Sequence, residues 1–233
     1  MTRSVERVLE LLDCFTEEHS EIGVSELSRI LGLSKTVTFR IASTLEKHGY
    51  LVQDSKLKHY RIGHKFLRLG QLFQNKLDFR VTALPYMEKI HKETDETITL
   101  FILRNGKRVC IERIHSTQPL RRVISVGDEL PLIGSPGKVL VAFSDDPDVV
   151  EASGLAIEEL ELTRSRGYAI SYGERQTGIT SVSAPIRNSD GKTVACISIA
   201  GPSFRYTDVT MAQYIQILLN STAKISLQMG FRG

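Results

Sequence analysis

Residues 34–47 combine side-chain types whose chemistry suits contact with DNA. A helix over this stretch, turning about 100° per residue, separates an apolar face from a polar one. The polar face and the start of the helix carry hydroxyls, an aromatic ring and three cations, on Ser34, Lys35, Thr36, Phe39, Arg40, Ser43 and Lys47. Arginine can donate two hydrogen bonds to guanine, threonine and phenylalanine can contact the methyl group of thymine, and lysine and serine can hold phosphates. The pattern predicts a helix that enters a DNA groove; the alternative is a face that is merely solvated.

The opposite face of the same helix is predicted to be its core side. That face carries Thr38, Ile41, Ala42 and Leu45. Thr38 can bury its methyl group there while its hydroxyl donates a hydrogen bond to the carbonyl of Ser34. Gly32 suits the left-handed end of a preceding helix and Ser34 the N-cap of this one. A tight turn is therefore expected between the two helices.

A second candidate for chemistry is the sequence Gly134-Ser135-Pro136-Gly137-Lys138. Ser135 is predicted to cap a helix whose first position is Pro136, where the missing N–H costs nothing. The free N–H groups of the first turn lie at the positive end of the helix and favour a carboxylate or a similar anion. From the residues alone, an ordinary helix start without a ligand is the alternative.

The elements that would position the first site follow one another closely along the chain. Ser4 and Ser25 are predicted to cap two helices with apolar residues at helical spacing, and a third helix runs from about residue 35 to 48. Two short strands, 50–52 and 59–62, follow with a turn between them. Helix, helix, tight turn, helix and hairpin is the order of a winged helix-turn-helix.

Positive charge is concentrated in this part of the chain. Residues 29–62 carry seven basic residues against two acidic ones, whereas residues 81–233 carry equal numbers of each sign. A local basic patch is typical of a module that binds a polyanion. Arg3, and Lys56 and Lys58 in the predicted hairpin, are placed to hold the DNA backbone or the minor groove. A surface that happens to be basic is the alternative.

Beyond residue 97 the apolar residues alternate with period two, which predicts strands. Asn105-Gly106 lies between two of them and is a strong signal for a hairpin turn. The predicted strands are 97–103, 107–114, 121–126, 168–172, 180–187 and 193–200, and the predicted helices are 136–143, 157–166 and 208–229. Antiparallel strands with helices at the flanks define an α+β domain.

Two more helices are predicted within residues 63–92, between these regions. The first has a stripe that is too apolar for solvent, on Phe66, Leu67, Leu69, Leu72 and Phe73. Two explanations stay open. The stripe belongs to a linker helix that pairs with its twin in a dimer, or it packs on the same chain.

Composition and motifs exclude several classes of protein. Hydrophobic residues make up 41% and charged residues 24%, near globular averages, which excludes a mainly disordered chain. The longest stretch without a charge, 209–223, is too short to span a membrane, and acidic residues in the first apolar pattern argue against a secretion signal. Three widely spaced cysteines make neither a disulfide framework nor a metal site, and Cys196 is expected to be buried. These features predict a cytoplasmic protein. No catalytic motif is present, so we expect a non-enzymatic protein without a cofactor.

Seven segments carry a resemblance to a known family. The first part contains RSVERVLELLDCF, VSELSRILGLSKTVTFRIASTLEKHGYLV and YRIGHKFLRLG, and the second contains DELPLIGSPGKVLVAF, RGYAIS, GITSVSAPI and SIAGPSFR. In this order and spacing the chain resembles the IclR family of bacterial transcription regulators; only the order Val37-Thr38 is reversed from the family's usual pair. The resemblance implies an α+β fold with a winged helix-turn-helix domain at 1–62, a linker helix at 63–76 and a GAF-like, antiparallel effector-binding domain at 77–233.

The resemblance also implies partners and a pocket. It implies a homodimer or a dimer of dimers that binds double-stranded operator DNA and responds to a small metabolite. The positions that match the family's pocket are Ile133, Gly134, Ser135, Ser171, Ile179, Ser181, Ser198 and Ala200. Small polar residues that alternate to one face of the strands would suit a compact organic acid, although the pattern fixes no arginine or lysine there.

The leading hypothesis is a transcription factor whose operator affinity is modulated by a small, carboxylate-bearing metabolite that binds two conformations unequally. An alternative is an α+β sensor whose winged helix contacts a protein instead of DNA. A third possibility is that the C-terminal domain only dimerises.

Overall fold

The computed structural model describes residues 3–16, 18–74 and 78–232. The chain divides into two units, Met1–Lys76 and Leu77–Gly233, and each is described by itself. No helix of the described residues is long and apolar enough to cross a membrane.

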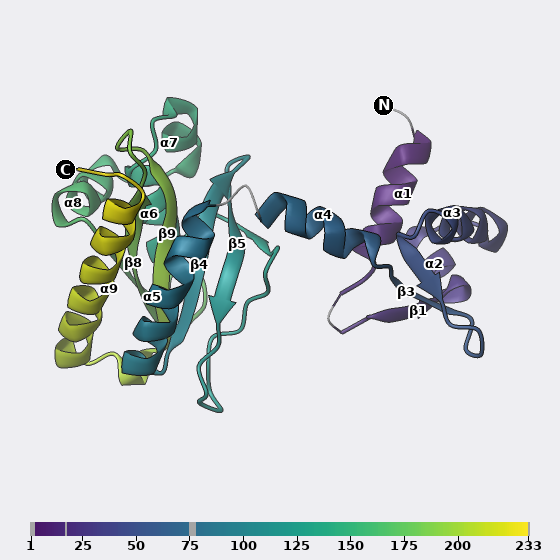
Figure 1. Cartoon of the computed structure of the whole chain (residues 1–233), viewed down its shortest axis with the longest axis horizontal. Helices are drawn as coiled ribbons and strands as arrows, with labels where there is room; N and C mark the ends of the chain where they lie inside the picture. Colours follow the sequence, from purple (N-terminus) through teal and green to yellow (C-terminus); the bar gives the residue numbers. More distant parts are fainter. Residues whose placement is uncertain (1–2, 17, 75–77, 233) are drawn as a thin grey trace. The chain divides into compact units, whose positions relative to one another are not determined.

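The N-terminal unit is a winged helix-turn-helix followed by one further helix (Figure 1). Its elements are α1 (Arg3–Asp13), β1 (Glu21–Gly23), α2 (Val24–Leu31), α3 (Lys35–Lys47), β2 (Leu51–Gln53), β3 (His59–Ile62) and α4 (Lys65–Gln74). The strands form an antiparallel sheet in the order β1-β3-β2. Every element from α1 to β3 contributes to one core, made by Leu11, Ile22, Leu27, Ala42, Leu45, Leu51 and Tyr60.

The turn between α2 and α3 forms as the sequence predicts. Gly32 ends α2 with a φ of 62°, and the N–H of Leu33 donates to the carbonyl of Ser28 at 3.1 Å. Ser34 caps α3 by accepting a hydrogen bond from the N–H of Val37, and Thr38 donates to the Ser34 carbonyl at 3.1 Å. These local bonds fix the angle at which α3 leaves the turn.

Two predicted caps in this unit are wrong. Ser25 lies inside α2, which begins at Val24 after Gly23 and has no side-chain cap. Ser4 likewise lies inside α1, which begins at Arg3. The chain around Ile22, for which the sequence predicted no strand, forms β1, with Ile22 fully buried opposite Tyr60 of β3. Burial of this one side chain extends the wing into a three-stranded sheet.

The start of α4 is fastened to the end of the helix-turn-helix. The N–H of Gly63 donates to the Tyr50 carbonyl at 2.7 Å, and the ammonium of Lys65 donates to the carbonyl of His48 at 3.1 Å. A Cβ at Gly63 would lie 2.3 Å from the carbonyl oxygen of Gly49, so only glycine allows this close approach. Phe66 packs edge-on against Tyr50, with ring centroids 5.4 Å apart.

Of the apolar stripe on α4, Phe66 therefore packs on the same chain. The remaining members are exposed: Leu67, Leu69, Leu72 and Phe73.

The C-terminal unit is built on a six-stranded antiparallel sheet in the order β6-β5-β4-β9-β8-β7. Its strands are β4 (Thr97–Arg104), β5 (Lys107–Ile114), β6 (Glu129–Leu130), β7 (Ala169–Tyr172), β8 (Ile179–Arg187) and β9 (Thr193–Pro202). Its helices are α5 (Asp78–Thr94), α6 (Ser135–Ala142), α7 (Pro147–Ser153), α8 (Ile157–Arg166), the short 3-10 helix η1 (Ser203–Arg205) and α9 (Asp208–Gln228).

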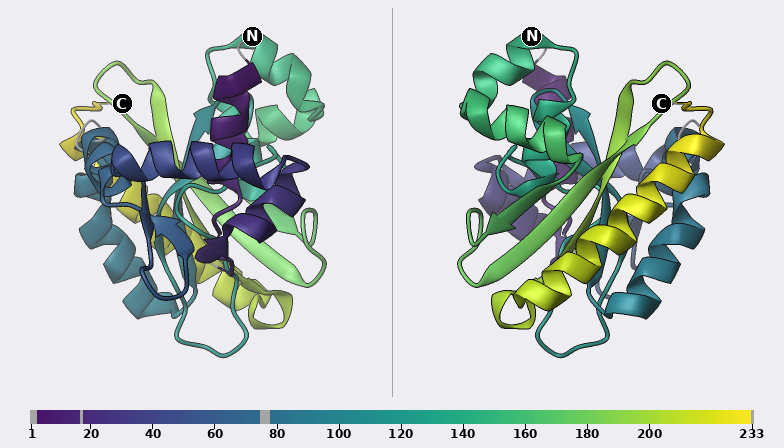
Figure 2. Two further views of the ribbon diagram at one scale, coloured as in Figure 1. Left: turned by 90° about the vertical axis from the view of Figure 1, so that its right-hand side faces the viewer. Right: turned by 90° about the vertical axis from the view of Figure 1, so that its left-hand side faces the viewer.

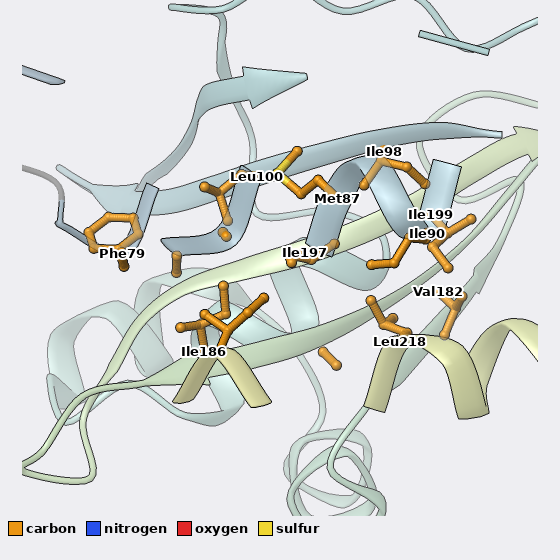
Figure 3. Close-up of a cluster of buried hydrophobic side chains, with 14 of the residues drawn as sticks. Phe79, Met87, Ile90, Ile98, Leu100, Val182, Ile186, Ile197, Ile199 and Leu218 are labelled. Carbon is orange, nitrogen blue, oxygen red and sulfur yellow. The ribbon is translucent and has the colours of Figure 1, made fainter. Parts of the chain in front are cut away.

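Helices cover both faces of this sheet. α5 and α9 lie side by side on one face (Figure 2). Between them and the sheet lies the larger core, in which side chains such as Met87, Ile98, Ile197 and Leu218 point toward one another (Figure 3). α6 covers the other face, where a smaller cluster includes Phe101 and Cys196. The candidate pocket lies on this α6 side.

Two elements of this unit differ from the sequence prediction. Residues 121–126 are not a strand; they form a loop in which Ile124 is buried in the α6-side cluster. The hydroxyl of Thr97 on β4 donates a hydrogen bond to the carbonyl of Arg122 at 2.9 Å and so holds this loop against the sheet. The alternating pattern arose from side chains that alternate between core and solvent without pairing. The second difference is α7, which Asp146 caps and Pro147 begins, a signal that the sequence carried and the prediction missed.

Candidate functional sites: the α3 surface and an arginine-lined pocket

α3 presents its polar face to solvent. Phe39 is 51% exposed, and Thr36 and Arg40 are exposed as well, whereas Ser43 is half-buried. Ser34, Lys35 and Lys47 are exposed at the two ends of the helix. On the opposite side Thr38, Ala42 and Leu45 are buried, as expected from their spacing. The side chains predicted to contact DNA therefore form one accessible surface.

The hairpin of β2 and β3 presents its lysines on an ordered turn. The carboxylate of Asp54 accepts hydrogen bonds from the N–H groups of Lys56, at 2.8 Å, and Leu57, at 2.7 Å. These two backbone hydrogen bonds lower the pKa of Asp54. Lys58 follows with a φ of 57°, and both lysines are exposed. The wing thus ends in two cations on either side of an exposed Leu57.

A groove separates α3 from the wing. Lys35, Thr36 and Phe39 line it from the helix, and Leu57 and Lys58 line it from the hairpin. A second groove, between α1 and α3, is lined by Arg40 and by Arg7, a residue that the sequence prediction did not include. Arg3, at the start of α1, is exposed.

The cations of this surface are not neutralised within the described part of the chain. Lys35, Arg40, Lys47, Lys56 and Lys58 make no ion pair there, whereas Arg29 and Arg61 of the same unit pair with Glu26 and Glu21. The cations predicted to contact DNA thus keep their charge available for phosphates, and so do Arg7 and Arg68 of the same described unit.

The pocket of the C-terminal unit lies between the sheet, the N-terminus of α6 and two loops. Seven of the eight expected positions line it: Ile133, Gly134, Ser171, Ile179, Ser181, Ser198 and Ala200. The strand register explains how they meet, because Ser171 pairs with Ser181, Ser181 with Ala200, and Ser198 with Thr99. Thr99 is a further lining residue that the sequence prediction lacked.

Ser135, the eighth expected position, has a different place. It is the first residue of α6, not its cap, and it is fully buried. Its hydroxyl is 2.7 Å from the hydroxyl of Ser181 and 2.8 Å from that of Ser183, so it fastens α6 to β8. Gly134 takes the N-cap position with a φ of 84°, a conformation in which a serine would be strained.

Three arginines line the pocket that sequence reasoning did not find: Arg108 on β5, and Arg122 and Arg175 on the two loops. Arg108 is only 4% exposed, and its guanidinium lies 5.1 Å from the ring centroid of Phe101. Its Nε has no hydrogen-bond partner among the described residues. Burial, with a smaller contribution from the nearby charge of Arg175, lowers the pKa of Arg108 to about 10.

Of these three arginines, Arg108 could have been predicted from the sequence. Strand alternation places Arg108 on the same face as Cys110, which is buried, so an arginine was predictable on a covered face of β5. Arg122 and Arg175 could not have been predicted, because both lie in loops whose course depends on the folded structure.

The two loops at the mouth of the pocket are tied in place. Arg122 donates to the side-chain oxygen of Gln176 at 2.8 Å. The buried ammonium of Lys138 on α6 lies 2.5 Å from a carboxylate oxygen of Glu174 and 2.5 Å from one of Glu159. Burial lowers the pKa of Lys138, but these two carboxylates raise it, and the net shift is upward. Lys138 is therefore used to hold the loop and does not line the pocket.

The arrangement suits an anion. Three arginines, one threonine and three serines line the pocket, and no acidic side chain is among the lining residues. The described residues also contain no group of three or more histidine, cysteine or acidic side chains that could hold a metal. Cys196 is fully buried, as expected, and burial raises its pKa to about 12.

Comparisons with known proteins give the same relatives for both units. Residues 4–55 match the model of the IclR helix-turn-helix domain, and residues 72–154 and 149–227 match that of the bacterial transcriptional regulator IclR C-terminal domain. The HTH-type transcriptional regulator XynR of Escherichia coli is 27% identical over 246 residues, which cover 98% of each chain. The HTH-type transcriptional regulator KdgR of the same organism is 28% identical, over 98% of this chain and 93% of the relative.

Solved structures show the same fold. The crystal structure of Thermotoga maritima IclR superposes with a TM-score of 0.83 at 24% identity, over 99% of this chain and 100% of the other. An IclR homologue from Microbacterium hydrocarbonoxydans, crystallised in complex with 4-hydroxybenzoate, gives a TM-score of 0.83 at 21% identity, over 97% and 98% of the two chains. Since the two family models together match most of the sequence, this chain belongs to the IclR family of bacterial transcriptional regulators.

Proposed function

We propose that the protein binds operator DNA through α3 and the wing, and that a small carboxylate-bearing metabolite in the C-terminal pocket modulates this binding. The observation that carries the first half is the set of exposed cations on α3 and the wing that no described carboxylate neutralises. The observation that carries the second half is a pocket lined by arginines and hydroxyls, without an acid.

In the DNA complex, α3 lies in the major groove. Arg40 is placed to read guanine, and Thr36 and Phe39 to contact thymine methyl groups. The helix ends hold phosphates through Ser34, Lys35, Ser43 and Lys47. Lys56 and Lys58 on the wing, and Arg3, contact the backbone or the minor groove. The groove between α3 and the wing supports this arrangement, because it is lined by cations on both sides.

In the effector complex, the carboxylate binds near the N-terminus of α6. The N–H groups at a helix N-terminus favour an anion, and Arg108 supplies a full positive charge beside them. The effector-binding residues we propose are Ile133, Gly134, Ser171, Ile179, Ser181, Ser198 and Ala200, with Ser135 positioning α6. The 4-hydroxybenzoate bound by the Microbacterium homologue, itself a small acid, supports a ligand of this class.

The functional form is a homodimer or a dimer of dimers in the cytoplasm. Its supporting observation is the set of exposed apolar side chains on α4, which contains Leu67, Leu69, Leu72 and Phe73. A group of exposed apolar side chains is typical of an interface.

The experiment that tests this function measures duplex affinity as a function of salt. Operator fragments are first selected from random duplexes by the full-length protein. If α3 and the wing neutralise roughly six to ten phosphates, affinity should fall by about 10³–10⁵ between 50 and 200 mM salt. A small acid that shifts this affinity and raises the melting temperature supports the effector half. Absence of duplex affinity at any salt would contradict the proposal and favour a winged helix that contacts a protein, an alternative with no observation in its favour.

A further inference from the structure

We propose that the pocket takes a small organic dianion, a dicarboxylate with one acidic group at Arg108 and the other at Arg122 and Arg175. This inference rests on the proposed function, because it assigns a ligand class to the same pocket. It goes further by fixing the number of charges on the ligand and where each one binds.

The inner half of the site is a buried cation without a counter-charge. Arg108 is 4% exposed, and its Nε lacks a hydrogen-bond partner among the described residues. A Cβ placed on Gly134 would lie 3.9 Å from Nη1 of Arg108 and 3.4 Å from Oγ of Ser171. The guanidinium, this hydroxyl and the first turn of α6 therefore meet around Gly134. A carboxylate there would satisfy donors that are otherwise buried.

The outer half of the site consists of two further cations on different loops. Arg122 precedes the buried Ile124, and Arg175 lies in the turn between β7 and β8. The side chain of Gln176 joins the two loops by accepting from Arg122 at 2.8 Å. Neither arginine pairs with a carboxylate of the described chain.

The acid nearest to Arg175 in the sequence is already engaged. Glu174 directs its carboxylate to Lys138 at 2.5 Å, and Glu159 does the same from α8. Neither carboxylate lines the pocket. The protein thus supplies counter-charges to the lysine behind the pocket and leaves the arginines in the pocket without any.

Charge balance then indicates two negative charges on the ligand. A monoanion at Arg108 would leave Arg122 and Arg175 uncompensated in the same pocket. Arg108 and Arg175 repel each other in the unliganded protein, and this repulsion contributes to the lowered pKa of Arg108. A dianion neutralises Arg108 and one of the two charges on the loops, where Arg175 is exposed to solvent and Arg122 is half-buried.

The apolar part of the lining favours a ligand with a short hydrocarbon part. Ile124, Ile133 and Ile179 line the pocket together with Phe101. Hydroxyls of the sheet, including those of Thr99 and Ser198, offer hydrogen bonds to a polar substituent. An organic dicarboxylate fits a lining of both charged and apolar side chains better than an inorganic dianion does.

The test titrates the full-length protein with matched pairs of ligands at constant ionic strength, by calorimetry. The probes are malonate, succinate, glutarate and adipate, each compared with its own monoamide, and 4-hydroxybenzoate as an aromatic monoanion. We expect one dicarboxylate to bind at least tenfold more tightly than its monoamide. Arg175→Gln should reduce this ratio to near one and leave the affinity for the monoamide unchanged.

Arg121→Gln provides the control, because Arg121 is an exposed neighbour that does not line the pocket. It should leave both affinities unchanged. Equal affinities for diacid and monoamide throughout the series, or a preference for the diacid that survives in Arg175→Gln, would overturn the dianion proposal. Tight binding of 4-hydroxybenzoate alone would overturn it too and leave the proposed function standing. Failure of every acid to bind would overturn both.

Discussion

The two candidate sites hold positive charge in opposite ways. On α3 and the wing, cations such as Arg40 and Lys58 are exposed and keep their hydration. In the pocket, Arg108 is buried without a counter-charge. An exposed charge costs little to keep, whereas a buried one lowers stability until a ligand pairs with it. The surface thus suits a long polyanion, which releases its bound counterions when it binds. The pocket suits a small ligand that carries negative charge.

The largest expected effect concerns the buried charge. Arg108→Met should weaken the best-binding dicarboxylate by about 2–5 kcal/mol, as expected when one member of a buried charge pair is lost. The unliganded protein should not lose stability. Because the folded-state pKa is lowered to about 10, the folded protein holds this proton less strongly than the unfolded chain, so the charge opposes folding at neutral pH. Calorimetry and thermal unfolding measure the two effects, and a large fall in melting temperature would contradict the second.

A paired buried charge in the same unit should behave in the reverse way. Glu96 is 1% exposed, and both of its oxygens accept from Arg205 at 2.6 Å. Arg205→Ala leaves this carboxylate buried and unpaired, and should lower the unfolding free energy by about 3 kcal/mol. Chemical denaturation of this variant beside Arg108→Met separates paired from unpaired charge. Similar losses in the two variants would show that the comparison has no energetic basis.

On the exposed surface, the strongest single contact should be that of Arg40. Arg40→Ala should weaken binding to the selected operator by about 1–3 kcal/mol, the usual contribution of a bidentate contact with a base. Arg29→Ala is the matched control, since Arg29 is an exposed arginine of the same unit that pairs with Glu26. Gel shifts at fixed salt measure both variants, and an unchanged affinity in Arg40→Ala would remove this residue from the reading face.

The smallest effect should come from the wing. Lys56→Ala should weaken all duplexes alike and reduce the slope of log affinity against log salt by about 1, because it removes one phosphate contact. The turn should persist, since Asp54 accepts from the backbone N–H of residue 56 whatever its side chain. A change in sequence preference would instead assign Lys56 to base readout.

The same contrast explains what the sequence could predict. The bonds of the α2–α3 turn join residues at most five apart, so the positions of Gly32, Ser34 and Thr38 followed from local pattern alone. The pocket brings together β5, β8 and two loops far apart in the chain. Its serines were found through the family resemblance, but Arg122 and Arg175 were not, because loop positions depend on tertiary contacts. The predicted N-cap role of Ser135 is wrong for a related reason. Its hydroxyl has hydrogen-bond partners on β8, and these compete with capping of α6.

The junction at Gly63 has a mechanical consequence. Gly63, Lys65 and Phe66 contact His48 and Tyr50, which lie between α3 and β2, so the start of α4 is joined directly to the end of the helix-turn-helix. A rotation of α4 about its axis would therefore be passed on to α3 through these contacts. In the proposed DNA complex, such a rotation would change the angle of α3 in the groove and move Arg40 relative to the base that it is proposed to read.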